Sequence, residues 1–174
     1  MPSLQPEQAL IIRDFVLPNL KAEHLVTRRV VEAIPLDNGD YRPDAIGKSA
    51  IDLAWHIVGA EHRFLDAAVT GAFDFSNTGR PDSLRTSADI AGWYGETFER
   101  DVKRVEALAG DQLVKTIDFR GIFQLPAIAY VQIGMNHSIH HRGQLSTYLR
   151  PMGAKVPSIY GESYDSAQAK TPRA

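Results

Sequence analysis

The sequence contains no cysteine. This absence excludes disulfide bonds, thiolate metal ligands and a cysteine nucleophile. Any metal ion that the chain binds must therefore be held by nitrogen and oxygen atoms. For the same reason, a reaction that consumes a thiol would need that thiol as a separate co-substrate.

Long apolar runs and an excess of one charge are also missing. No segment approaches the ~18–20 apolar residues of a membrane span, and the N-terminus lacks the basic and apolar regions of a secretory signal. The formal net charge is −2 and the isoelectric point is about 6.3, so nothing indicates a surface for nucleic acid or an anionic membrane. We therefore expect a cytoplasmic protein with neither nucleic-acid nor membrane partners.

What the chain has in quantity is helical periodicity. With 174 residues, of which 44% are hydrophobic, it is long enough to bury one core in a single domain. Apolar residues recur with helical spacing in four segments, which are separated by clusters of Pro, Gly, Asn, Asp and Ser. The segments cover about residues 5–34, 46–70, 87–109 and 126–150. This pattern predicts an all-α bundle.

The boundaries of these segments carry further expectations. Pro18 should kink the first helix or split it in two, because proline removes a backbone hydrogen bond. Thr86, followed three residues later by Asp89, predicts the start of the third helix. The polar connection 72–86 is long enough to cover one end of a bundle. Apolar and polar residues alternate weakly over residues 111–124, which predicts an extended segment or a crossover.

Three of the six histidines fall within five residues, at His137, His140 and His141. On a helix, residues four apart lie on the same face with Cβ atoms about 5–6 Å apart, so His137 and His141 can direct two imidazoles at one metal ion. The pair His137 and His140 is also geometrically possible, although helical projection favours His141. A third ligand must come from elsewhere in the chain.

The other histidines differ in the direction that they face. His56 projects to the edge of the apolar stripe of the second predicted helix and therefore faces the core. His62 projects to nearly the opposite side, which makes it a poor ligand candidate. His24 has no helical partner and is expected to be a surface or packing residue. Asp52 lies near His56 in projection and could accept its second N–H group.

Other polar side chains lie close to the histidines of the last predicted helix. Tyr130, Gln144 and Tyr148 project to the same side and could orient a ligand, but helix packing explains them about as well. Arg142 projects away from His137, and we expect it to form a bracing ion pair rather than to act in catalysis.

Several common catalytic motifs are absent. The chain has no His-Glu-x-x-His of zinc proteases, no Glu-x-x-His of ferritin-type di-iron bundles and no Gly-x-Ser-x-Gly elbow. A single inward histidine is more often a hydrogen-bonded core residue than a metal ligand. Two interpretations of the histidines therefore stay open from the residues alone, a metal site and a wet core in which they make only hydrogen bonds.

One motif is specific enough to compare with a known family. It is His137-x-x-x-His141-Arg142-Gly143-Gln144 on the last predicted helix, which is accompanied by His56 on the second. Weaker matches are Leu53-Ala54-Trp55-His56-Ile57 and residues 149–153 and 156–161. Together these features span most of the chain and resemble the DinB/YfiT-like family.

The resemblance implies a four-helix bundle with a long crossover connection and a homodimeric assembly. It implies a single domain over residues 1–160, followed by a C-terminal tail over 161–174 that we expect to be flexible. It further implies one divalent metal ion, held by His56, His137 and His141. Zinc and nickel are the first candidates for this ion, and iron and manganese are further ones.

The resemblance also implies a range of functions. Three neutral imidazoles leave a tetrahedral zinc ion one open position for water or substrate, as in catalytic rather than structural sites. The expected activity is a metal-dependent transferase that uses a low-molecular-weight thiol, or a hydrolase, acting on a small-molecule substrate. The alternative is a metal-binding bundle without turnover, acting in stress response or as an interaction module. A substrate-sized cavity open to the site would favour the enzyme, and a sealed site would favour the alternative.

Overall fold

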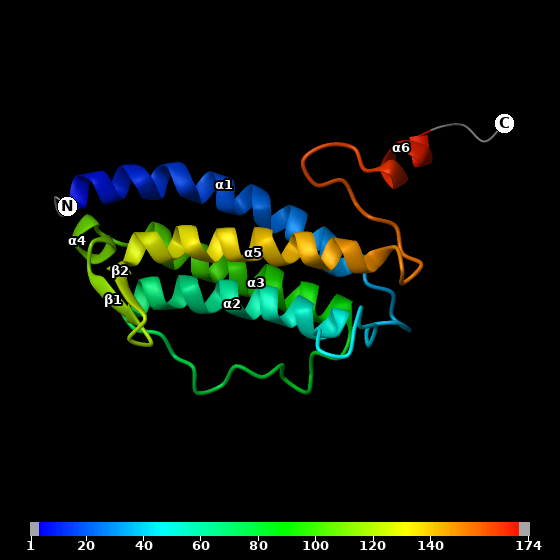
Figure 1. Ribbon diagram of the computed structural model, residues 1–174. Helices are drawn as coiled ribbons and strands as arrows, with labels where there is room; N and C mark the ends of the chain where they lie inside the picture. Colours follow the sequence, from blue (N-terminus) through cyan, green and yellow to red (C-terminus); the bar gives the residue numbers. More distant parts are fainter. Residues whose placement is uncertain (1–3, 171–174) are drawn as a thin grey trace.

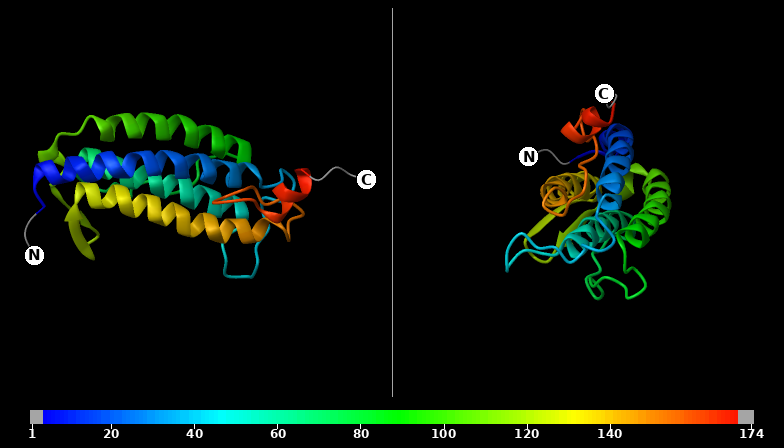
Figure 2. Two further views of the ribbon diagram at one scale, coloured as in Figure 1. Left: turned by 90° about the horizontal axis from the view of Figure 1, so that it is seen from above. Right: turned by 90° about the vertical axis from the view of Figure 1, so that its right-hand side faces the viewer.

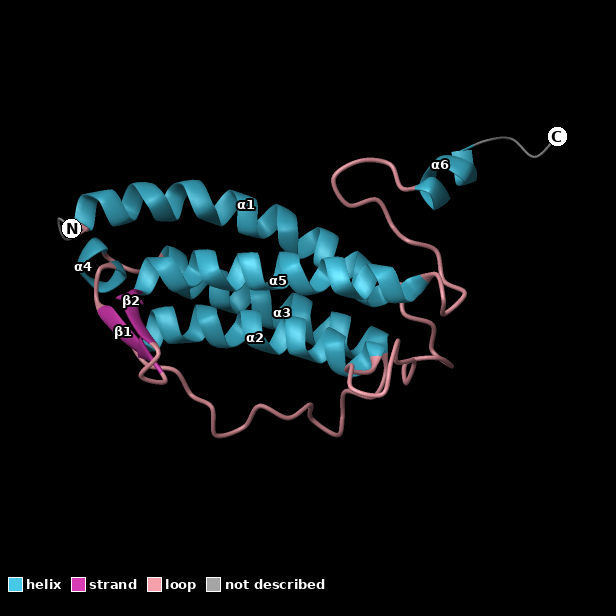
Figure 3. Ribbon diagram, in the orientation of Figure 1, coloured by secondary structure: helices cyan, strands magenta, loops and turns pink. Residues whose placement is uncertain are grey.

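Each of the four periodic segments forms one long helix. The structure is a computed structural model that describes residues 4–170. Its elements, shown along the chain in Figure 1 and by type in Figure 3, are α1 (Pro6–Glu32), α2 (Ala50–Thr70), α3 (Ser87–Glu106), α4 (Gly110–Leu113), β1 (Thr116–Phe119), β2 (Phe123–Pro126), α5 (Ala127–Leu149) and α6 (Tyr164–Lys170).

Two of the helix starts are fixed by side chains that accept the first backbone N–H groups. The Ser49 hydroxyl accepts the N–H of Asp52 at 3.2 Å, so α2 begins at Ala50 and not at residue 46, where the periodicity placed its start. Thr86 and Asp89 form a capping box, in which each side chain accepts the backbone N–H of the other residue. The predicted start of α3 is thereby confirmed.

The four long helices pack into a bundle, which confirms the predicted fold class. In Figure 1, α1 and α5 run in one direction and α2 and α3 in the other, and Figure 2 shows the same bundle from above and from one end. Because α2 and α3 are parallel, the chain must return along the bundle between them. Residues 71–86 make this long crossover, and they run beside α2 rather than covering an end of the bundle.

Residues 111–124 contribute to a β-hairpin and not to the crossover. Strands β1 and β2 pair antiparallel, with Phe119 opposite Phe123. The Tyr130 hydroxyl donates to the Ile117 carbonyl at 2.8 Å and so ties the first turn of α5 to the hairpin. Of the two alternatives for this segment, the extended one is confirmed.

Helix α1 continues through Pro18 as one helix. Of the two predicted alternatives, the split does not occur. Figure 1 shows that α1 bends about midway along its length, which agrees with the predicted kink, because a helix that lacks one internal backbone hydrogen bond can bend without ending.

The most extensive contact between helices joins α2 to α5. Gly134 of α5 faces Phe64 of α2 in this contact, and a Cβ atom at Gly134 would lie only 2.8 Å from the Cβ atom of Phe64. A side chain at this position would have to push the two helices apart, because interiors are close-packed. The absence of a side chain at Gly134 therefore sets how closely α2 and α5 approach.

An arginine and a glutamate brace the bundle from inside. Arg142 of α5 is 1% exposed, and its guanidinium donates to the Glu23 carboxylate of α1 at 2.5 Å. The same guanidinium donates to the Tyr160 hydroxyl at 2.8 Å, which holds the chain beyond α5 against the bundle. The expected bracing role of Arg142 is confirmed. A buried charge requires such partners, since an unpaired one is strongly destabilising.

The segment that follows Tyr160 contains a short helix, α6. Asp165 of α6 accepts the backbone N–H of Val156 at 3.0 Å and lies 3.2 Å from the Arg150 guanidinium. The flexibility of residues 161–174 stays a prediction, and residues 171–174 lie outside the described part of the chain. Among residues 4–170, no helix is both long enough and apolar enough to cross a membrane.

Glu61 of α2 is a second charged group in the core. It is 1% exposed and accepts a hydrogen bond from the Tyr94 hydroxyl at 2.6 Å. Burial raises the pKa of Glu61 to about 7, although the Tyr94 hydroxyl and the charge of Arg142 act in the opposite direction. The carboxyl group of Glu61 is therefore about half protonated near neutral pH.

Gly134→Ala tests the close approach of α2 and α5. We expect it to lower the free energy of unfolding by about 1–3 kcal/mol, because the added methyl group overpacks the contact with Phe64. Gly143→Ala is the matched control on the same helix, since nothing lies within 4 Å of a Cβ atom there. We expect that control to raise stability by about 0.5–1 kcal/mol. Urea unfolding followed by circular dichroism measures both changes, and equal effects would contradict the close approach.

Glu61→Gln tests the raised pKa of the buried carboxyl group. Because the folded-state pKa of Glu61 is about 7 and its ordinary value is 4.5, the stability provided by the neutral acid is present below pH 4.5 and is lost as the pH rises through 7. Between pH 5 and pH 8, the variant should therefore gain about 2–3 kcal/mol over the wild type. Unfolding of the chelator-treated proteins at several pH values measures this difference. A difference independent of pH would contradict the shift.

Candidate metal centre

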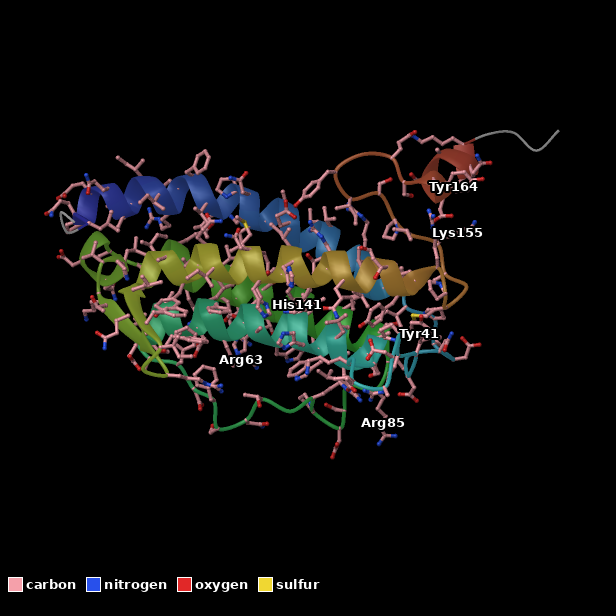
Figure 4. All side chains as sticks on the ribbon, in the orientation of Figure 1. Tyr41, Arg63, Arg85, His141, Lys155 and Tyr164 are labelled. Atoms are coloured by element: carbon pink, nitrogen blue, oxygen red, sulfur yellow. The ribbon has the colours of Figure 1, made fainter. Side chains whose placement is uncertain are left out.

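Three histidines meet between α2 and α5. His56 extends from α2, and His137 and His141 extend from α5, so that one ligand nitrogen from each lies within 4.8 Å of the other two. Their ring centroids are 4.5 Å apart for His137 and His141, 4.6 Å for His56 and His141, and 4.8 Å for His56 and His137. Figure 4 shows His141 in the space between the two helices. The structure thus brings together the three residues selected from the sequence.

The local sequence explains this meeting. His137 and His141 are one helical turn apart and therefore share a face of α5. Gly134, one turn before His137, lets α5 approach α2 closely enough for His56 to reach the pair. The cluster depends on one spacing within a helix and on one close contact between helices.

Burial holds two of the imidazoles in their neutral form. It lowers the pKa of His56 to about 4, and the neighbouring His141 and Lys48 lower it further. Burial also lowers the pKa of His137 to about 4, assisted by His141 and His56. Both side chains are therefore uncharged at neutral pH, which is the state that binds a metal ion.

Gln144 orients the third imidazole. Its side-chain oxygen lies 3.0 Å from Nδ1 of His141, and its amide nitrogen donates to the Tyr148 hydroxyl at 3.2 Å. Because an amide oxygen can only accept, this contact favours the tautomer of the neutral imidazole that has its proton on Nδ1 and its lone pair on Nε2. That Nε2 atom lies 3.2 Å from Nε2 of His56. Histidines that bind a metal ion through one ring nitrogen commonly donate a hydrogen bond from the other ring nitrogen in this way.

The donor set fits a divalent metal ion. Nδ1 of His137 is buried and has no hydrogen-bond partner within the described part of the chain. Among residues 4–170 the cluster contains only histidines, so its ligands are neutral nitrogen atoms. Imidazole ligands suit zinc, nickel, copper and iron, whereas sites for calcium and magnesium use oxygen. The cluster could therefore hold one such ion and leave a coordination position open.

The remaining histidines lie outside the cluster. His140 is exposed, and its ring centroid lies 4.7 Å from that of His141. His62 pairs through Nδ1 with the buried carboxylate of Asp101 at 2.5 Å. His24 is buried and stacks on Phe98 with ring centroids 3.8 Å apart, so it is the packing residue that the sequence suggested.

Two polar side chains have roles other than those considered from the sequence. The Asp52 carboxylate accepts a hydrogen bond from the Ser49 hydroxyl at 2.7 Å and lies 3.5 Å from the Arg42 guanidinium. The suggestion that it accepts a hydrogen bond from the second N–H of His56 is therefore wrong. Tyr130 turns away from the cluster and binds the hairpin. Gln144 and Tyr148, by contrast, do take part in orienting His141.

A cavity of about 290 Å³ opens beside the cluster, and its walls include His56 and His137. Its other walls come from α2, from the crossover 71–86 and from the hairpin. The side chains that matter for binding are two arginines and four phenylalanines, namely Arg63, Arg120, Phe64, Phe73, Phe75 and Phe119. Sequence reasoning did not assign these residues to a site, because two of the six lie on the crossover and two on the hairpin. The sequence signal for this part of the cavity wall was the presence of apolar residues within the otherwise polar crossover.

Comparison with known proteins decides the family. The DinB family profile matches residues 16–174. The chain belongs to the DinB family. Uncharacterized protein YjoA of Bacillus subtilis (strain 168) is 32% identical to this DinB-family chain over 132 residues, which cover 74% of this chain and 82% of that protein.

Solved structures of DinB-like proteins share the fold. The crystal structure of the DinB-like protein YjoA from Bacillus subtilis matches with a TM-score of 0.70 and 28% identity, over 85% of this chain and 99% of that one. A DinB-like protein from Bacillus cereus matches with a TM-score of 0.70 and 23% identity, over 83% and 95% of the two chains, and shows the fold alone. The family expected from the histidine motifs is confirmed.

Gln144→Ala tests whether orientation of His141 matters for metal binding. We expect zinc affinity to fall about 10–100-fold, since loss of a hydrogen bond to a ligand histidine has effects of that size. Gln144→Glu retains the acceptor and should preserve affinity. Gln132→Ala is the matched control, because Gln132 is half-buried on the same helix and its side-chain amide donates to Asn136 at 2.9 Å, away from the cluster. Competition with a coloured zinc chelator measures the affinities, and equal values for the Gln144→Ala and Gln132→Ala proteins would contradict the assignment.

Proposed function

We propose that this DinB-family protein is a metal-dependent enzyme in which His56, His137 and His141 hold one divalent metal ion. Zinc and nickel are the first candidates, followed by iron and manganese. The observation that carries the proposal is that three imidazoles face one another, and that two of them, His56 and His137, are held neutral by burial and line an open cavity. A purely structural zinc site is usually closed by a fourth protein ligand.

The groups of the site would have different roles in such an enzyme. A bound divalent ion would supply a Lewis acid that lowers the pKa of a water molecule or a thiol. Gln144 holds His141 in the tautomer that binds at Nε2. The phenylalanines of the cavity exclude water from a substrate that lies against His56 and His137.

The reaction that we propose is transfer of a low-molecular-weight thiol to an electrophilic small molecule, or hydrolysis of such a molecule. Because the chain has no cysteine, the thiol enters as a co-substrate. The deprotonated sulfur of the thiol would attack the electrophile, and the leaving group would depart with the electron pair of the broken bond. In the hydrolytic alternative a water molecule takes the place of the thiol.

A metal-binding bundle without turnover is the second candidate. A sealed site would favour it, and the cavity beside His56 and His137 supports the enzyme instead. The homodimer and the cytoplasmic location stay predictions. Exposed apolar side chains on α1, among them Ile11, Phe15 and Leu25, would be suited to a contact between two copies.

The test begins with metal content. We expect the wild type, loaded with zinc or nickel and desalted, to hold one ion per chain by mass spectrometry of the metal. His137→Ala should lose this stoichiometric ion, because two imidazoles bind far more weakly than three. His140→Ala is the matched control, since this exposed neighbour lies outside the cluster, and it should retain the ion.

The same proteins then separate the two functions. Glutathione with chlorodinitrobenzene detects thiol transfer, and nitrophenyl acetate detects hydrolysis. Turnover in the metal-loaded wild type and in His140→Ala, but not in His137→Ala, supports the enzyme. Metal binding without turnover supports the non-catalytic bundle, and a wild type that retains no metal contradicts both.

A further inference from the structure

Two arginines stand in the wall of the cavity beside the histidine cluster. Arg63 extends from α2, two turns after His56, and Arg120 extends from the turn between β1 and β2. Figure 4 shows Arg63 on the side of α2 that the crossover passes. Within the described part of the chain, no acidic side chain lines this cavity. The three histidines add no negative charge to it either, so its charge is entirely positive.

Neither guanidinium has a charged or hydrogen-bonding partner among residues 4–170. The acids nearest in sequence are already engaged, since Asp118 accepts the N–H of Gly121 at 2.9 Å and Asp66 accepts from the Arg104 guanidinium at 2.7 Å. Glu61 is buried and accepts from the Tyr94 hydroxyl. Burial lowers the pKa of Arg63, and the positive charge of Arg120 lowers it further. The two like charges are thus close enough to repel each other across the cavity. Elsewhere in the bundle, the half-buried Arg104 and the buried Arg142 both have carboxylate partners.

The backbone at Arg120 is also unfavourable for an arginine. Arg120 has φ 55° and Gly121 has φ 70°, and the N–H of Ile122 donates to the carbonyl of Phe119 at 2.9 Å. Positive φ at both central residues is the pattern of a type I′ turn, in which Asn, Asp or Gly is preferred at the position of Arg120. A strained residue beside a candidate site indicates selection for its side chain rather than for the turn.

Aromatic rings form most of the other walls of the cavity. The Arg120 guanidinium lies 3.8 Å above the ring of Phe75, which leaves its N–H edge free to donate. Phe73 packs against Phe75 and Phe119 with ring centroids 5.5 and 4.9 Å apart. The volume of about 290 Å³ is near the lower end of pockets for small ligands, which begin at roughly 300 Å³. The ligand is therefore small, with an apolar body.

We propose that this cavity binds a small organic acid, whose anionic head group lies between Arg63 and Arg120 and whose aromatic or aliphatic body lies on the phenylalanines. A guanidinium donates two parallel N–H bonds to an oxyanion, either carboxylate or phosphate, and an anion between the two arginines relieves their mutual repulsion. The assignment rests on the proposed function, since it names the class of its substrate. Bound in this way, the body of the acid extends toward His56 and His137.

Phenylacetate, its neutral amide phenylacetamide, acetate and phenyl phosphate are the probes. Calorimetric titration into the zinc-loaded and the chelator-treated protein measures their affinities. We expect phenylacetate or phenyl phosphate to bind at least about tenfold more tightly than phenylacetamide, because only an anion forms charge-assisted bonds to the arginines. Acetate should also bind at least about tenfold more weakly, because it lacks the apolar body. Whichever of the two anions binds more tightly identifies the head group.

Arg120→Asn gives the sharpest variant, because it removes the guanidinium while placing a favourable residue in the turn. We expect its affinity for the anionic probe to fall at least about tenfold while its thermal stability is unchanged or higher. Arg63→Gln should show a similar loss of affinity. Arg100→Gln is the matched control, because Arg100 is exposed on α3 and does not line the cavity, and it should bind the probe as the wild type does.

The outcomes separate this inference from the proposed function. Zinc content of every variant is measured alongside, and we expect Arg63→Gln and Arg120→Asn to retain the ion. Zinc retained together with unchanged affinity for the anionic probe in both variants overturns the inference and leaves the metal site standing. Equal binding of phenylacetate and phenylacetamide also overturns it. Tight, arginine-dependent binding by a wild type that takes up neither zinc nor nickel supports the inference and contradicts the proposed function.

Discussion

The close approach of α2 and α5 is the constraint on which the candidate site depends. Gly134 allows it, because the position opposite Phe64 has no room for a side chain. With the helices this near, His56 reaches His137 and His141 without help from any loop. Arg142 and Glu23 then fix α5 to α1 from the other side, so that the histidine face of α5 cannot rotate away from α2. The cluster is therefore built on rigid elements, as precise sites usually are.

The connections supply what the helices cannot. The parallel arrangement of α2 and α3 requires a crossover that passes along α2, and this crossover carries Phe73 and Phe75 to the cavity. The hairpin before α5 supplies Phe119 and Arg120, and the Tyr130 hydroxyl holds it in place. Helices thus determine the cluster, whereas connections determine the shape and charge of the space beside it. Differences in specificity among chains of this fold would then arise in the connections, which tolerate substitution better than the core does.

Most of the fold and the three histidines could be predicted from the sequence. The 3.6-residue period located four helices, and the spacing of His137 and His141 placed both on one face. Projection failed for Asp52, because it orders residues around one helix axis and says nothing of partners such as Arg42 on a loop. The aromatic and basic walls of the cavity were missed for the same reason. They come from separate elements, and only the tertiary fold brings them together.

The charges around the cavity argue that this part of the protein is not arranged for stability alone. The buried charge of Arg142 has a carboxylate partner, and so does the half-buried Arg104. Arg63 and Arg120, in contrast, face the cavity without a carboxylate partner among the described residues, and Arg120 occupies a strained backbone position. Folding alone would favour a carboxylate near Arg63 and an asparagine in the turn. The charged groups of the core have partners, whereas these two arginines have no carboxylate partner in the described part of the chain and one of them lies in a strained turn. A bound anion, as the partner of both arginines, would explain this difference.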